Sequence, residues 1–147
     1  MTSPTLVLIH GAGDTARVWS RTQEHLRAPS LAIDLLGRAS RPFDLAQLRL
    51  AEVAEQAAAD VRAVVSGPIV LVAHSAGGVI GVRLAALLRA EVRHLVLVAG
   101  ISAPEGGEPA DQLHPERRVQ FETMLPKLRD QHAGTSYARG DAIAALR

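Results

Sequence analysis

Cysteine is absent from the 147 residues, and aromatic residues make up only 3% of them. Without thiols the chain forms neither disulfides nor thiolate metal sites, and cysteine-based catalysis is excluded. Basic and acidic residues are nearly equal in number, 16 and 15, and no basic cluster is interleaved with aromatic residues. We therefore expect neither nucleic acid nor an anionic membrane as a partner.

Long apolar runs and metal-ligand patterns are also missing. No apolar run is long enough to span a membrane, and the N-terminal Met-Thr-Ser-Pro-Thr lacks the basic region of a signal peptide. We therefore expect a cytoplasmic protein. His, Asp and Glu residues do not recur with the spacing of metal ligands, so we expect no metal and no cofactor.

The chain does contain the composition of one globular domain, with 48% hydrophobic and 21% charged residues. Apolar runs alternate with helical patterns, which is typical of an α/β fold with a parallel sheet and helices on both faces. The four predicted strands, all expected to be buried, are Thr5–Ile9, Leu31–Leu35, Ile69–Ala73 and His94–Ala99. The predicted helices are Ala16–Leu26, a second helix capped by Asp44 with apolar positions from Leu50 to Val64, and Ala76–Leu88. We expect a single domain over residues 1–147, with the sheet in 1–103 and a loop and lid-like helical segment in 104–147.

The most informative segment is Ile69–Gly78, which reads IVLVAHSAGG. A short apolar run stops at Ser75 between small residues and a helical pattern follows at once, which is typical of a nucleophile elbow. Ala73 and Gly77 lie where larger side chains would collide as strand and helix fold back on each other. At the start of a helix, the Ala76 N–H is the natural donor to an oxyanion. The alternative is a plain strand-to-helix turn in which Ser75 has no chemical role.

A second glycine turn follows the first predicted strand, at His10-Gly11-Ala12-Gly13. Gly11 and Gly13 allow a turn that exposes the backbone, and the N–H of Ala12 is our candidate for a second oxyanion donor. We expect His10 to support this loop by hydrogen bonding rather than to catalyse.

The same loop also fits a dinucleotide-binding fingerprint. Residues 11–16 read GAGDTA, a form of G-x-G-x-x-A, and Asp34 follows about 20 residues later, where a Rossmann fold has its ribose-binding acid. Against this alternative, Trp19 follows the loop closely and the elbow segment is left unexplained. We expect Asp34 to bond nearby backbone at the end of its strand.

With both loops considered, the sequence resembles the α/β-hydrolase superfamily, and in particular its small esterases and hydroxynitrile-lyase-like members. The motifs that carry the resemblance are HGAG at 10–13 with Trp19, DLLGRAS at 34–40, and AHSAGG at 73–78. The resemblance implies a strand order of 2-1-3-4, the N-terminal part of such a fold with a partial helical lid. It also implies that Ser75 is the nucleophile and that Ala12 and Ala76 supply the oxyanion hole. Lyase chemistry, which this superfamily performs with the same elbow, stays open.

The acid and histidine that complete the superfamily's triad after further strands have no obvious counterpart here. Weak candidates for the base are His114 and His132, with Asp111, Asp130 or Asp141 as orienting acids. Neither histidine follows a strand, so we expect both to be surface residues. His74 is expected to point away from the pocket.

We therefore predict a serine hydrolase, in complete or truncated form, that acts on a small ester or related acyl substrate through Ser75. One alternative is a non-catalytic or partner-dependent protein of the same fold, and another is the dinucleotide-binding module. Because the fourth strand would lack a neighbour, we expect either a piece of a longer hydrolase or association through this edge, with a second copy or a complementing chain.

Overall fold

A computed structural model describes residues 3–39, 41–44, 47–102, 114–120 and 122–123. Its four strands form one parallel sheet in the order β2-β1-β3-β4, which confirms the predicted order. The strands are β1 (Thr5–Ile9), β2 (Ser30–Ile33), β3 (Ile69–His74) and β4 (Val92–Val98). All lie within two residues of their predicted bounds.

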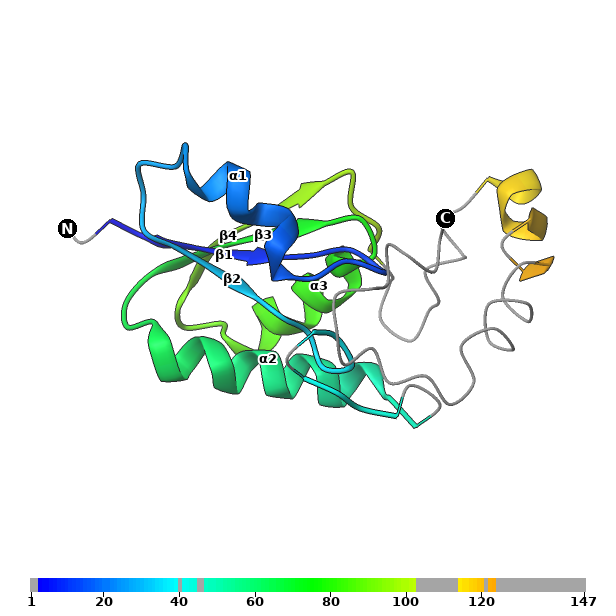
Figure 1. Cartoon of the computed structure of the whole chain (residues 1–147), viewed down its shortest axis with the longest axis horizontal. Coiled ribbons are helices and arrows are strands. Elements are labelled where there is room, and N and C mark those ends of the chain that lie inside the picture. Colours follow the sequence, from blue (N-terminus) through cyan, green and yellow to red (C-terminus); the bar gives the residue numbers. More distant parts are fainter. Residues whose placement is uncertain (1–2, 40, 45–46, 103–113, 121, 124–147) are drawn as a thin grey trace.

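Helices cover both faces of the sheet, as Figure 1 shows. A 3-10 turn η1 (Ala16–Trp19) and the short helix α1 (Ser20–Gln23) lie on one face, and α2 (Leu50–Val64) and α3 (Gly77–Leu87) lie on the other. Successive side chains of the central strand β1 point to opposite faces of the sheet. Val7 and Ile9 belong to the core between the sheet and the helices α2 and α3, whereas Leu8 does not.

Two predictions about helix bounds are wrong. The expected helix Ala16–Leu26 is only η1 followed by four α-helical residues, because η1 and α1 bury a single side chain, Trp19, and so lack the apolar face that stabilises a longer helix. The second helix is not capped by Asp44. It begins at Leu50, where the backbone N–H of Arg49 donates to the Glu52 carboxylate at 3.2 Å.

The main core lies between the sheet and the helices α2 and α3. Small side chains on the buried face of α2 let its backbone approach its neighbours closely: Ala54, Ala57 and Ala58 are almost fully buried between Val53 and Val61. This packing places the amino end of α3, and therefore Ser75, at the carboxyl edge of the sheet.

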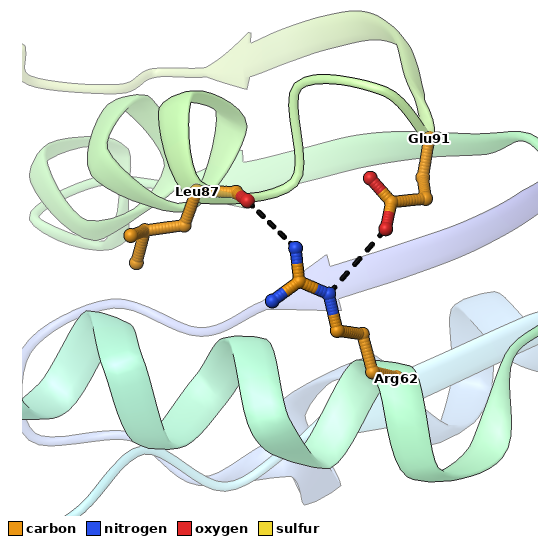
Figure 2. A network of polar contacts seen from close by, with 3 residues as sticks. All are labelled: Arg62, Leu87 and Glu91. Atoms are coloured by element: carbon orange, nitrogen blue, oxygen red, sulfur yellow. Dashed lines mark hydrogen bonds and ion pairs between the residues drawn. The ribbon is translucent and has the colours of Figure 1, made fainter.

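A polar network fastens the end of α3 to α2 on the outside of this core (Figure 2). The Arg62 guanidinium donates through Nη2 to the Leu87 carbonyl at 2.8 Å and pairs through Nε with Glu91 Oε1 at 3.4 Å. Leu87 is the last residue of α3, so its carbonyl has no partner within the helix. Arg62 supplies that partner from α2.

The prediction that all four strands are buried is wrong for β4. Val96, Leu97 and Val98 are 44%, 41% and 41% exposed, and among the described residues β4 pairs only with β3. Val92 and Leu95 of β4 pack against the core, but no element in the described part of the chain covers Val96, Leu97 and Val98.

Residues 115–120 and 122–123 are helical and those with described side chains are exposed. In Figure 1 they lie on the side toward which the strands point, apart from the sheet. Across the described ranges, the structure contains no helix with the length and apolar character needed to cross a membrane.

Candidate active site

Ser75 occupies a sharp turn between β3 and α3. Its φ angle is 52°, a left-handed conformation that costs a non-glycine residue about 1–2 kcal/mol. Two neighbouring segments hold it there: the Ser75 N–H donates to the Val98 carbonyl at 3.1 Å, and the Ser75 carbonyl accepts from Gly78 and Ile101, both at 3.0 Å. The predicted strand-to-helix turn is therefore present and is fastened to the end of β4.

Small residues around Ser75 are required by close backbone contacts, as the sequence suggested. A β-carbon on Gly77 would come closer than 3.0 Å to the His10 carbonyl oxygen, and one on Gly78 would come equally close to the Ile101 carbonyl. A β-carbon on Gly81 would lie 2.9 Å from that of Ala73, so a larger residue at 73 would collide with α3. The turn depends on these approaches between strand and helix.

The loop after β1 packs directly onto the Ser75 turn. A β-carbon on Gly11 would lie 3.1 Å from the Ser75 β-carbon and 3.2 Å from Nδ1 of His74. Gly13, two residues on, has a φ angle of 78° that favours glycine. The structure therefore brings the two glycine turns together, although they are more than sixty residues apart in the chain.

Ala12 and Ala76, the two expected oxyanion donors, line the same cavity of about 130 Å³. Neither backbone N–H donates to another residue in the described part of the chain. The cavity walls are mostly apolar, and its lining residues are His10, Gly11, Ala12, Leu35, Leu36, Arg38, Leu48, Leu50, Val53, Ala76, Gly77 and Ile80. Ser75 is not one of these residues but lies beside them in the chain.

His10 is buried beneath the loop and links it to the end of β2. Its Nδ1 lies 2.8 Å from the Gly11 carbonyl oxygen, and its Nε2 lies 3.2 Å from the Leu35 nitrogen. Since the backbone N–H of Leu35 can only donate, we assign the proton to Nδ1, which then donates to Gly11. Burial lowers the pKa of His10 and outweighs the opposing effect of the Gly11 carbonyl and of Asp34. The bond from the Leu35 N–H needs the neutral ring, because only an unprotonated Nε2 can accept it.

Asp34 fastens the far end of the same loop. Its Oδ1 accepts the backbone N–H of Ala16, the first residue of η1, at 2.7 Å. This backbone bond is the role expected for a strand-end aspartate. The third strand pairs with β1, whereas a Rossmann fold places it beyond β2, so the dinucleotide-binding arrangement is not the one adopted.

The described residues bring no base to Ser75. His114 is exposed, before the helical residues 115–120, and no imidazole in the described ranges is hydrogen-bonded to the Ser75 hydroxyl. His132 and the three candidate acids, Asp111, Asp130 and Asp141, lie outside the described residues. Nor do three His, Asp or Glu side chains gather anywhere in these ranges to hold a metal ion.

One contact was not evident from the sequence. The His74 ring does not line the cavity, but it meets the Trp19 ring edge to face, with centroids 6.4 Å apart and planes at 88°. The two residues are 55 positions apart, and only the pairing of β1 with β3 brings them together. A sequence pattern gives no signal for such a contact.

Comparison with known proteins agrees with this geometry. The model of a family described as "Alpha/beta hydrolase family" matches residues 6–145. The chain is similar to the lipase LipV of Mycobacterium tuberculosis, with 38% identity over 106 residues that cover 70% of the chain and 40% of the lipase.

Solved structures show the same fold. An extracellular alpha/beta-hydrolase from a Paenibacillus species matches 88% of the chain with a TM-score of 0.77 and 20% identity. An esterase of M. tuberculosis matches 89% with a TM-score of 0.64 and 25% identity. The chain covers 54% and 43% of these two proteins, so it spans about half their length.

Proposed function

The chain belongs to the alpha/beta hydrolase family, and from this premise we propose that it carries the nucleophile and oxyanion hole of a serine hydrolase acting on small esters or related acyl substrates. The observation that carries the proposal is the juxtaposition of Ser75, in its left-handed turn, with the Gly11 loop. The names of the related lipase and esterase support hydrolysis.

In the proposed reaction the Ser75 Oγ attacks the carbonyl carbon of the ester and gives up its proton to a base. The carbonyl oxygen becomes an oxyanion, which the N–H groups of Ala12 and Ala76 stabilise at the amino end of α3. Collapse breaks the bond to the alcohol, which leaves with the proton, and an acyl-enzyme remains. Water then releases the acid and restores the serine. One oxyanion donor contributes about 3 kcal/mol, so the pair is a large part of the rate enhancement.

The cavity beside the two alanines supports a small substrate. At about 130 Å³ it is below the roughly 300 Å³ at which pockets hold a whole drug-sized ligand, and near the roughly 150 Å³ of a protein cavity that takes up benzene. Leu35, Leu48 and Ile80 in its wall favour an apolar group. We therefore infer that it receives a short apolar part of the ester.

Labelling with a fluorophosphonate tests the proposal, because this probe reacts covalently only with an activated hydroxyl. We expect one probe per chain, attached at Ser75, and none in Ser75→Ala. Ser66→Ala is the matched control, since Ser66 is exposed and remote from the turn. Failure of the folded protein to label, or equal labelling of Ser75→Ala, would overturn the proposal.

A non-catalytic or partner-dependent role is the second candidate. It is favoured by the observation that no described imidazole is hydrogen-bonded to Ser75, since a serine without a base is a weak nucleophile. In this case the chain alone binds a small ester without hydrolysing it and labels only after a further polypeptide is added.

We also propose that the outer edge of β4, which pairs with no strand among the described residues, pairs with the β4 of a second copy. Two identical edges can pair antiparallel about a two-fold axis, and the exposed Val96, Leu97 and Val98 supply apolar surface on that edge. Sedimentation at several concentrations should give a dimer, and Val96→Lys should shift it toward the monomer. A monomer at all concentrations contradicts this pairing. The expected cytoplasmic location stays a prediction.

A further inference from the structure

The loop that carries Ala12 is held at both ends by the residue that precedes the nucleophile. At the start of the loop, a β-carbon added to Gly11 would lie only 3.2 Å from Nδ1 of His74. At its end, Trp19 meets the ring of His74 edge to face. One imidazole from the end of β3 thus lies close to Gly11 and to Trp19, at the two ends of the segment that follows β1.

Trp19 is suited to hold the loop through this ring contact. Its side chain is 9% exposed, and its Nε1 has no hydrogen-bond partner in the described part of the chain. Its position is therefore fixed by packing rather than by a polar anchor. Trp19 is the last residue of η1, the 3-10 turn that follows the loop carrying Ala12.

The other anchors of the loop lie on a different side. The Leu35 N–H binds His10, and Asp34 binds the Ala16 N–H, so both connect the loop to the end of β2. These anchors connect the loop to β2, whereas the nucleophile turn is approached by the His10 carbonyl, at Gly77, and by Gly11, at Ser75 and the His74 ring.

We propose that His74 is a positioning residue whose ring, packed against Gly11 and Trp19, keeps the Ala12 amide in register with Ser75. The expected effect of His74 on the reaction rate rests on the proposed function. The packing of its ring against Gly11 and Trp19 does not depend on that function. The ring acts by shape and contact and transfers no proton. An aromatic ring without a titratable nitrogen should therefore replace it.

The packing role can be measured without a substrate, because Trp19 is the only tryptophan of the chain. Acrylamide quenching of its fluorescence should increase about two- to threefold in His74→Ala, as local opening exposes the indole, and stay near the wild-type value in His74→Phe. His94→Ala, which removes an exposed histidine from β4, is the matched control. Unchanged quenching in His74→Ala would overturn the proposal.

The kinetic role is measured on p-nitrophenyl acetate. We expect kcat of His74→Ala to fall on the order of 10- to 100-fold with little change in KM, and His74→Phe to recover most of the loss. If His74→Phe is as inactive as His74→Ala, the imidazole takes part in the reaction itself and the proposed positioning role is wrong.

A second variant and the independence of the two measurements distinguish misfolding of His74→Ala from failure of the proposed function. If His74→Ala does not fold, His74→Asn tests the same contacts with a smaller polar group, and the same quenching and kcat changes are expected. If the wild-type chain neither labels with fluorophosphonate nor hydrolyses the ester, the proposed function fails, while the quenching measurement still decides whether His74 holds the loop.

Discussion

Gly77 lies so near the backbone carbonyl of His10 that a β-carbon at position 77 would come closer than 3.0 Å to the carbonyl oxygen. This contact joins the first residue of α3 to the residue that opens the loop after β1. Both residues line the cavity of the candidate site.

Gly77→Ala should therefore destabilise the protein by about 1–3 kcal/mol, since backbone on both sides must move to admit the β-carbon. Urea unfolding followed by circular dichroism measures the change. Val82→Ala, at an exposed position of the same helix, is the control and should change stability by less than about 1 kcal/mol. A Gly77→Ala protein as stable as wild type would contradict the contact.

Stability should fall below neutral pH because of His10. Burial lowers its pKa in the folded protein below the ordinary value of about 6.5, so between these two values the unfolded chain binds a proton that the folded chain does not. The stabilisation is complete above the unfolded value and is lost as the pH falls through it toward the folded value. Asp34, Asp14 and Arg38 are the charged groups that act on the ring.

Urea unfolding at pH 7.5 and at pH 5 measures this effect. In His10→Gln the difference between the two pH values should shrink, because the glutamine amide does not titrate while its oxygen can still accept the Leu35 N–H. His94→Gln, exposed on β4, should retain the wild-type difference. An unchanged pH difference in His10→Gln would show that another group is responsible.

The network of Arg62 should contribute modestly to stability. Its side chain is 54% exposed and its ion pair with Glu91 is screened by solvent, so Arg62→Ala should cost about 1 kcal/mol, mainly through the lost bond to the Leu87 carbonyl. A double-mutant cycle with Glu91→Gln isolates the ion pair, and we expect a coupling below about 1 kcal/mol. A coupling well above this value would mean that the pair is shielded from water.

Leu48→Ala should widen the cavity and change which esters are preferred. The ratio of kcat/KM for p-nitrophenyl hexanoate to that for the acetate should rise about 10-fold, because the wider cavity holds extra methylene groups. Val64→Ala is the control, on the exposed end of α2 and outside the cavity. An unchanged ratio would place the acyl chain elsewhere.

Local patterns in the sequence were sufficient to predict the strands, the turn at Ser75 and the need for small residues at positions 73 and 77. Each of these depends on neighbours in the chain: apolar runs bounded by glycine, and a strand that passes into a helix within a few residues. The strand order came from the resemblance to a known superfamily, and the structure confirms it.

Contacts between distant segments were decided only by the tertiary structure. The pairing of β1 with β3 sets Gly11 on Ser75 and brings Trp19 to His74, and neither contact has a signature in the local pattern. Burial was also decided at this level: Val92 and Leu95 of β4 pack against the core, whereas the equally apolar Val96, Leu97 and Val98 of the same strand stay exposed. Composition determines which side chains favour burial. Only the arrangement of the elements determines which of these side chains are buried.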